Sequence, residues 1–466
     1  MKSKNKYFRL VFTFWICVLF LICPTFLNEI NMKISENSNQ LHTAVTYTDL
    51  SYFTWGGSGS ESAYDVTIDS SNNTYIVGST DSFGAGDSDL CLLKFNSSGL
   101  EWNQTYGGIY GERGTSIVLD SFDNIYVTGY TTSYGAGSSD IWLLKINSSG
   151  GVEWNYTWGG IEDEFGRCIT LDSQNNAYIA GHTKSFGAGE FDMCLVKFNS
   201  SGLVWNYTCG GIDFENAYSL TLDPLGNAYV VGSTDSYGMG KTDLYLVKFN
   251  SSGTVWNKTW GCADWDQGTE IIYSPSGDLY VAGFYEYSPD CSKPAEYGPI
   301  PQYISLIKFN SEGIYQWNNT WTENTLAYTY AMVMDSSGNA YVAGYCRLRH
   351  LNEYDMCLIR FNTTGQADWS CIWGGNETEL SQGLVLGPNG TALVVGYTMS
   401  YGAGSSDLCM VEFKIGQCPV TLPDNGTPPD NGTPPIIPGY HIVILIGIAF
   451  AVSILLFKRK IFLSNF

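Results

Sequence analysis

The chain has 466 residues, with 45 Asp or Glu against 23 Lys or Arg, and a formal net charge of −22 at pH 7. This balance argues against nucleic-acid binding, because a phosphate backbone requires clustered cations. The four His residues leave the commonest general base and metal ligand nearly absent, and the 13 Cys lack the spacing of a disulfide-rich mini-domain.

Residues 1–30 have the layout of a secretory signal. Basic residues between Lys2 and Arg9 precede an apolar run from Leu10 to Leu27. No small-x-small cleavage site is evident, so a cleaved signal peptide and a retained N-terminal anchor both stay open. Residues 31–47 are interpreted as a linker.

Residues 48–418 are built from repeats of about 51 residues. The repeats align on one position at the end of an apolar segment, occupied by Lys94, Lys145, Lys197, Lys248, Lys308, Arg360 and Glu412. The successive separations are 51, 52, 51, 60, 52 and 52 residues. Seven units of this length indicate a β-propeller rather than a helical array.

Each unit is predicted to form four short strands, and no segment of the repeats has helical periodicity. In the first unit the strands contain Val66–Asp69, Tyr75–Gly78, Asp89–Lys94 and Trp102–Thr105. The turn between the first two strands carries residue types that tolerate a left-handed backbone. These residues are Asn72, Asp123, Asn175, Gly226, Gly277, Gly338 and Gly390.

The last unit lacks its fourth strand after Ile415. The missing strand is found at the other end of the repeats, where Asp49–Trp55 ends in the Thr-Trp-Gly-Gly seen between units. The sequence therefore predicts an all-β, seven-bladed propeller of four-stranded blades. Its ring is closed by the N-terminal strand, which hides the sheet edges.

The repeats resemble the bacterial and archaeal β-propeller repeat family called SBBP. The shared pattern is Trp-Gly-Gly, an acidic residue, apolar-Asp-x-x-Gly-Asn-x-Tyr-Val-x-Gly, then Asp-x-apolar-apolar-x-Lys-apolar-Asn, over residues 48–415. The resemblance implies the propeller fold and an exported or surface protein of a prokaryote. It implies little about function, because the family consists mostly of uncharacterised proteins.

One acidic column precedes the first strand of six of the seven units. Its members are Glu61, Glu112, Glu164, Glu215, Asp266 and Glu379. Such carboxylates at one mouth of the channel would form a ring that suits a hard cation such as Ca²⁺. A residue repeated in every blade more often performs a structural task, so the structural interpretation is favoured. No other cofactor, no metal centre and no catalytic residue is predicted.

The fifth and sixth units depart from the repeat. The long interval contains an insertion at 288–302, in which Cys291 is expected to form a disulfide with Cys262 in an oxidising exterior. The sixth unit replaces its Gly-rich loop with a basic segment. That segment supplies the candidate ligand-binding residues Arg347, Arg349 and His350.

The C-terminal region predicts a membrane attachment. Residues 419–438 form a Pro-rich stalk, 439–457 a single transmembrane helix and 458–466 a cytoplasmic tail that opens with Lys-Arg-Lys. This topology places the propeller outside the cell, where sequons on turns, outer strands and stalk are glycosylation candidates. They are Asn96, Asn103, Asn147, Asn155, Asn199, Asn206, Asn250, Asn257, Asn318, Asn362, Asn425 and Asn431.

These features favour a prokaryotic cell-surface module that binds an extracellular protein or glycan. Two alternatives stay open. One is an extracellular carbohydrate-active hydrolase or lyase that uses carboxylates at the channel mouth, for which one asymmetric carboxylate pair would be needed. The other is a structural glycoprotein of the cell envelope.

Overall fold

The structure is a computed structural model that describes residues 50–286, 302–321, 326–347 and 353–417. The predicted signal, linker, stalk, membrane helix and tail lie outside these ranges. Among the described residues there is no helix of the length and apolarity that a membrane crossing requires.

The described chain is all-β, and within it 28 strands are joined by loops and one 3-10 turn at Pro388–Gly390. The strands of the first four sheets are β2 (Glu61–Ile68), β3 (Thr74–Thr80), β4 (Asp89–Asn96), β5 (Gly99–Tyr106), β6 (Glu112–Leu119), β7 (Ile125–Thr131), β8 (Asp140–Ile146), β9 (Val152–Trp158), β10 (Glu164–Leu171), β11 (Ala177–Thr183), β12 (Asp192–Asn199), β13 (Gly202–Cys209), β14 (Glu215–Leu222), β15 (Ala228–Thr234), β16 (Asp243–Asn250) and β17 (Gly253–Trp260). The remaining strands are β18 (Asp266–Tyr273), β19 (Asp278–Glu286), β20 (Gln302–Asn310), β21 (Tyr315–Trp321), β22 (Leu326–Met334), β23 (Ala340–Arg347), β24 (Asp355–Phe361), β25 (Ala367–Trp373), β26 (Glu379–Gly387), β27 (Thr391–Thr398), β28 (Asp407–Lys414) and β1 (Ser51–Trp55).

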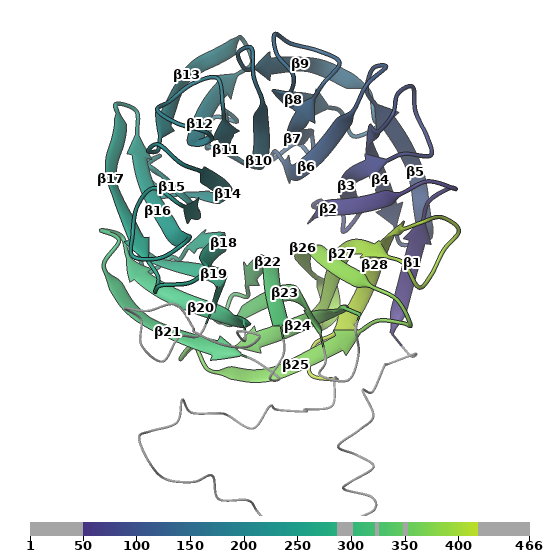
Figure 1. The fold of residues 1–466 in the computed structure, drawn as a ribbon. Helices are drawn as coiled ribbons and strands as arrows, with labels where there is room; N and C mark the ends of the chain where they lie inside the picture. Colours follow the sequence, from purple (N-terminus) through teal and green to yellow (C-terminus); the bar gives the residue numbers. More distant parts are fainter. Residues whose placement is uncertain (1–49, 287–301, 322–325, 348–352, 418–466) are drawn as a thin grey trace, which may run out of the picture. The chain divides into compact units, whose positions relative to one another are not determined.

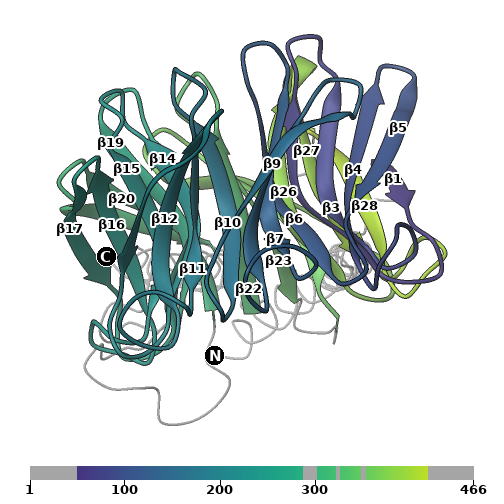
Figure 2. The same ribbon diagram turned by 90° about the horizontal axis from the view of Figure 1, so that it is seen from above.

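The strands form antiparallel four-stranded units with the order β2-β3-β4-β5 and its equivalents. The units β18–β21 and β22–β25 are joined into one eight-stranded sheet by a single parallel pair, Gln302 with Leu326. In Figure 1 the sheets surround a central axis, with the first strand of each unit innermost and the fourth strand outermost. Figure 2 shows the strands running between the two faces of this ring. The fold is propeller-like.

The N-terminal strand β1 pairs with the last strand, β28. The antiparallel register runs from Ser51 opposite Glu412 to Trp55 opposite Leu408, so the sheet order is β1-β28-β27-β26. The next sheet is connected here as well, because Glu61 N donates a hydrogen bond to Ser406 O over 2.9 Å. The outer strand of this sheet thus comes from the opposite end of the repeats.

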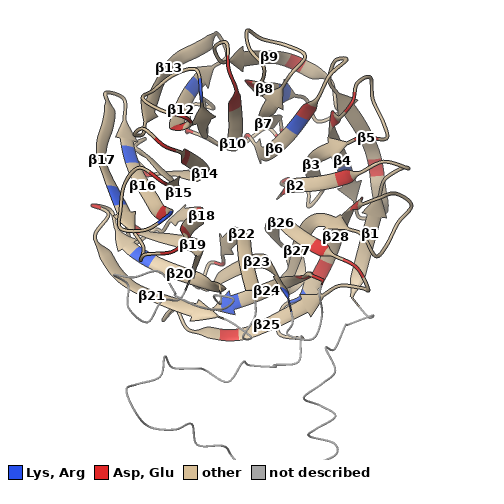
Figure 3. Cartoon of the chain, viewed as in Figure 1, with Lys and Arg blue, Asp and Glu red and all other residues tan. Residues whose placement is uncertain are grey.

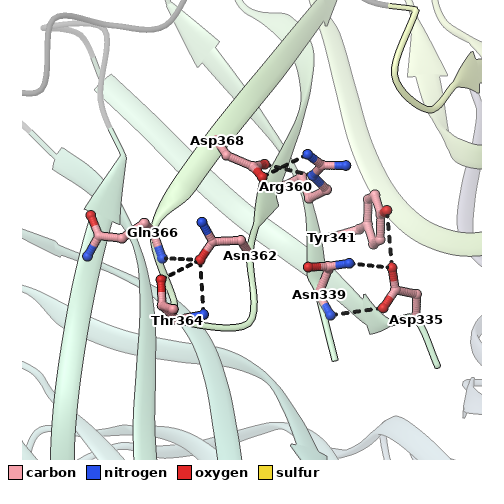
Figure 4. Close-up of polar contacts among 8 residues, drawn as sticks. All are labelled: Asp335, Asn339, Tyr341, Arg360, Asn362, Thr364, Gln366 and Asp368. Atoms are coloured by element: carbon pink, nitrogen blue, oxygen red, sulfur yellow. Dashed lines mark hydrogen bonds and ion pairs between the residues drawn. The ribbon is translucent and has the colours of Figure 1, made fainter. Parts of the chain in front are cut away.

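The turn between first and second strands adopts the predicted left-handed backbone. The φ angles are 65° at Asn72, 59° at Asp123, 60° at Asn175, 82° at Gly226, 87° at Gly277, 88° at Gly338 and 72° at Gly390. In most of these turns an aspartate side chain accepts hydrogen bonds from groups of the turn itself. In Figure 4, Asp335 accepts hydrogen bonds from Asn339 N, Asn339 Nδ2 and Tyr341 Oη.

A second repeated contact stabilises the outer half of the units. Tyr341, Arg360 and Trp369 lie opposite one another on three successive strands, and Arg360 donates from Nε and Nη2 to the two oxygens of Asp368, each over 2.7 Å. Figure 4 shows this bidentate pair beside the Asn362 turn. The cation also lies over an aromatic face, because Arg360 Cζ is 5.9 Å from the Trp369 ring.

The sheet that contains β1 lacks this contact. The positions that correspond to the tyrosine, the cation and the tryptophan hold Leu393, Glu412 and Ser51 in this sheet. Apolar side chains from neighbouring sheets hold it instead, since the core lies between adjacent sheets. Phe53 and Trp55 pack into the cluster that the first sheet shares with Val395 and Leu408.

Candidate axial ligand site

Every innermost strand contains a β-bulge, after its third residue in six strands and after its fourth, Thr329, in β22. The register shifts between positions such as Ala63 and Asp65, or Gly166 and Cys168. A bulge leaves one extra residue out of the ladder and re-aims its side chain. The extra residues, in sheet order, are Tyr64, Thr115, Arg167, Tyr218, Thr269, Tyr330 and Gln382.

These bulged positions differ from sheet to sheet, as do the positions two residues earlier. The earlier positions hold Ser62, Arg113, Phe165, Asn216, Gln267, Tyr328 and Leu380. The acidic column at the start of the same strands is almost constant. The variation between repeats is therefore concentrated at these two positions of each innermost strand. Figure 3 shows both basic and acidic residues on the innermost strand β6.

Two arginines stand out among these positions. Arg113 Cζ lies 4.9 Å from the ring centroid of Tyr64 and 5.7 Å from that of Tyr130. Arg167 Cζ lies 5.8 Å from the ring of Phe165. The Nε atoms of both arginines are buried and have no hydrogen-bond partner among the described residues. Neither guanidinium makes an ion pair with any carboxylate of the described ranges.

The surroundings of Arg167 show that side chains from four sheets converge there. Burial lowers the pKa of Arg167, the positive charge of Arg113 lowers it further, and the phenols of Tyr218, Tyr130 and Tyr64 oppose the change. These residues come from β2, β6, β7 and β14, whereas Arg167 is on β10. Strand β10 packs directly against β6, β7 and β14, whereas β2 lies two sheets away around the ring (Figure 1). We call Tyr64, Arg113, Tyr130, Phe165, Arg167, His182 and Tyr218 the axial cluster.

His182 adds an uncharged polar group to the axial cluster. Burial, followed by the charge of Arg167, holds its pKa well below the usual range, so the imidazole is neutral near pH 7. Its Nδ1 atom is buried without a hydrogen-bond partner among the described residues. The ring lies 5.3 Å from Phe165 and 5.1 Å from Phe191, centroid to centroid.

A group of tyrosines continues the cluster on the opposite side of the axis. The ring of Tyr345 lies 5.1 Å from that of Tyr328 and 5.8 Å from that of Tyr330. Burial raises the pKa of Tyr397, and the phenols of Tyr64 and Tyr330 raise it further. Of the strands that carry these tyrosines, β2 packs against β27. This arrangement offers aromatic rings and hydroxyl groups on the side of the axis opposite the two arginines.

Two carboxyl groups lie in the layer next to the cluster, each directly after a bulged residue. Asp65 Oδ2 accepts hydrogen bonds from Ser116 Oγ and Ile117 N, both 2.9 Å long. Glu270 Oε1 accepts from Ser219 Oγ and from Ile271 N. Burial raises the pKa of Asp65 to about 6 and that of Glu270 to about 8. A largely protonated Glu270 does not neutralise the arginines at pH 7.

Glu270→Gln is expected to stabilise the protein at high pH and to change little at low pH. Because the folded-state pKa is raised from 4.5 to about 8, the stability that the protonated carboxyl contributes is present below about pH 4.5 and is lost as pH rises through about 8. A pKa change of this size corresponds to roughly 5 kcal/mol. Melting temperatures at pH 5 and pH 9 measure the effect. The exposed Glu162→Gln is the control, and equal shifts at both pH values would contradict the prediction.

The predicted acidic column lies between sheets, buried at the start of the innermost strands. Glu61 Oε1 accepts from Thr80 Oγ1 over 2.9 Å, and its Oε2 accepts from Gly57 N over 2.8 Å. Glu112, Glu164, Glu215 and Glu379 repeat this pattern, and Asp266 accepts from Cys262 N. These contacts fit the structural interpretation of the column. Among the described residues, no group of three or more His, Cys, Asp or Glu is arranged to hold a metal ion.

The other candidates are only partly described. Arg347 ends β23, and its Cζ lies 5.8 Å from the ring of Tyr354, which contacts Tyr345 at 5.3 Å. This contact connects Arg347 to the tyrosines beside the axial cluster. Arg349 and His350 lie outside the described residues. Cys262 is disulfide-bonded, and its predicted partner Cys291 also lies outside them.

The sequons fall into two structural classes. On outer strands, Asn103, Asn155, Asn206 and Asn257 are exposed, whereas Asn318 is half-buried. On turns, Asn96, Asn147, Asn199, Asn250 and Asn362 each accept a hydrogen bond from the backbone N–H two residues later. Their Oδ1 atoms therefore build the turn. Asn425 and Asn431 lie outside the described residues.

The axial cluster was missed by the sequence reasoning, although a signal for it exists. Its arginines follow the constant acidic column by one position at Arg113 and by three at Arg167. Sequence alignment of the repeats shows that these positions vary. It does not show that the first strand is innermost or bulged, and that geometry is what gathers the variable residues at one axis.

Comparison with known proteins supports the repeat assignment. The model of the SBBP family, described as a beta-propeller repeat, matches residues 113–135 and 216–238. Both segments begin on an innermost strand. The first begins at Arg113 and the second at Asn216, in the variable column described above.

Relatives with known names are distant. An uncharacterized WD repeat-containing protein of Acanthamoeba polyphaga mimivirus is 20% identical over 40% of this chain and 19% of its own length. The regulatory protein FlaEY of Caulobacter vibrioides is 23% identical over 70% of this chain and 34% of its own length. The chain thus spans about a third or less of these relatives. Among solved structures, the Neurospora crassa Pan2 WD40 domain aligns with 75% of this chain and 88% of that domain, at 10% identity and a TM-score of 0.41.

Proposed function

Because the chain carries SBBP-type beta-propeller repeats, we propose that it is a seven-bladed, ring-closed propeller that works as an interaction module. It binds its ligand at the axial cluster. The pairing of β1 with β28 supports ring closure, and the 28 strands of the described residues support seven blades of four.

The observation that carries this proposal is the pair of arginines at the axis. Burying a charge without a partner is costly, and placing a second like charge nearby adds repulsion. In a protein with a net charge of −22, carboxylates are abundant, yet none within the described residues pairs with Arg113 or Arg167. An anionic group of a ligand at this position would satisfy both guanidiniums.

The cellular placement is part of the proposal. A secretory signal at residues 1–30 and a membrane helix at 439–457 followed by Lys-Arg-Lys hold the propeller outside the cell. The exposed sequon asparagines on the outer strands support this orientation, because they lie on the rim of the ring, away from the axis. Glycans there leave the ligand site accessible.

An enzyme is the second function that a specific observation favours. Asp65 and Glu270 lie near the axis, and their raised pKa values suit a general acid near neutral pH. Each carboxyl group, however, accepts a backbone N–H and a serine hydroxyl, so its hydrogen bonds already connect innermost strands. We therefore propose binding in preference to hydrolysis. Turnover of a polysaccharide that Glu270→Gln abolishes would reverse this preference.

The double variant Arg113→Gln/Arg167→Gln is expected to weaken ligand binding by about a hundredfold, because each charged hydrogen bond contributes roughly 1.5–3 kcal/mol. An array of glycans and surface proteins, probed with the purified chain, supplies the ligand, and titration gives the affinity. Lys258→Gln on the exposed outer strand β17 is the matched control, since it removes one cation far from the axis. Unchanged binding by the double variant would contradict the proposed site.

A further inference from the structure

The composition of the axial cluster also indicates the chemical class of its ligand. We infer that the ligand is a sugar residue that carries a single carboxylate, as a uronic acid does. This inference rests on the proposed function, because it identifies what the axial cluster binds.

The negative charge of the ligand follows from the two guanidiniums. Arg113 lies over the ring of Tyr130 and Arg167 over that of Phe165, and these two rings are 4.9 Å apart. The Nε atoms of both arginines have no partner among the described residues. A guanidinium is a planar fork whose N–H groups match the two oxygens of a carboxylate. The neutral His182 adds no further positive charge. The cluster therefore compensates one or two negative charges.

The ring of the ligand follows from the aromatic side chains. Tyr64 lies against Arg113, and Phe165 lies against Arg167, so an anion held by the arginines has aromatic groups next to it. The C–H face of a pyranose packs against an aromatic ring, while its rim of hydroxyls needs polar partners. Polar groups are present on the neighbouring innermost strands, because Tyr218 lies on β14 and Gln267 on β18. A simple inorganic anion would leave these rings and amides unused.

The net charge of the protein separates a sugar from an acidic peptide. A formal charge of −22 repels a highly negative partner at long range. A ligand with one carboxylate on each bound sugar ring is repelled less than a highly charged peptide. Its carboxylate still forms the charged hydrogen bonds to the arginines. A polar, weakly charged ring fits these conditions better than a run of acidic side chains does.

Methyl β-D-glucuronide is the probe for this inference, and methyl β-D-glucoside is its matched neutral control. Calorimetric titration of the full chain is expected to show binding of the glucuronide and at least about tenfold weaker binding of the glucoside. Arg113→Gln and Arg167→Gln are each expected to lower glucuronide affinity about tenfold or more. Arg167→Lys keeps the charge but loses the planar fork of N–H groups. Its glucuronide affinity is expected to lie between those of the unmodified chain and Arg167→Gln. Melting temperatures at or above that of the unmodified chain verify that the variants fold, because each Gln removes a buried, unpaired charge.

Three outcomes would overturn the inference. Equal binding of the glucoside would remove the need for the carboxylate. Equal or tighter binding of sodium acetate, sulfate or a hexaglutamate peptide would replace the sugar with another anion, while a dependence on Arg113 and Arg167 would leave the proposed binding function intact. Absence of glucuronide binding, when an array ligand still depends on the two arginines, would also reject only the sugar. An array ligand that is indifferent to both arginines would instead reject the proposed function itself.

Discussion

Gly129→Ala is expected to destabilise the protein by about 3 kcal/mol or more. A Cβ atom at Gly129 would lie 1.8 Å from the carbonyl oxygen of Arg113 and 3.0 Å from the Cα of Gly114. These atoms are backbone atoms of the bulge on β6, so no side-chain rotation can relieve the clash. The innermost strand must move, and the position of Arg113 in the axial cluster moves with it.

Melting temperature and ligand affinity of Gly129→Ala are the measurements, and both are expected to fall. Gly111→Ala is the matched control in the same unit, because its added Cβ would meet only Thr132 Oγ1 at 3.6 Å. Equal melting temperatures for the two variants would show that the bulge yields easily. The close approach would then not fix the backbone at the axis.

Thr54→Pro is expected to cost on the order of 3 kcal/mol, several times more than Thr105→Pro. Both threonines occupy outermost strands at the same register position, since Thr54 lies opposite Cys409 and Thr105 opposite Cys91. Proline disturbs the ladder equally at each site. The difference is that β5 follows β4 through a short turn, whereas β1 is held to β28 by pairing and packing alone.

Loss of β1 also removes aromatic contacts with both neighbouring sheets. Phe53 lies 4.8 Å from Phe95, and Tyr52 lies 5.4 Å from Trp373, between ring centroids. Hydrogen exchange is expected to rise along β28 in Thr54→Pro, while in Thr105→Pro it rises only along β4 and β5. Equal exchange along β28 in the two variants would show that β1 is dispensable for the stability of its sheet.

The repeats made most of the fold predictable. The residue type alone predicts a left-handed backbone at turn positions such as Asn72 and Gly226, and the φ angles agree. The outermost strand Ser51–Trp55 was assigned from a matching motif, which is a comparison within the sequence. Both features depend on local chemistry that recurs in every unit, so seven copies strengthen one pattern.

The candidate site was less predictable, because it depends on geometry that no single repeat encodes. The sequence drew attention to the constant carboxylates, such as Glu61, which prove to be buried hydrogen-bond acceptors. Arg113 and Arg167 lie 54 positions apart, on different units. They are connected through the rings of Tyr130 and Phe165, because strands β6 and β10 pack against each other. A column that varies carries no repeat signal, and therefore drew no attention.

The pairing of β1 with β28 also determines when the last sheet can form during synthesis of the chain. Ser51 leaves the ribosome 361 residues before its partner Glu412. Strand β1 therefore stays unpaired until β28 has been synthesised. Throughout that interval an aromatic strand with the sequence Ser-Tyr-Phe-Thr-Trp has no partner in its own chain. Unpaired edges of this kind bind whatever matching edge is nearest. At high expression the strand of one nascent chain is then expected to complete the ring of another, which makes dilution and synthesis rate determinants of yield.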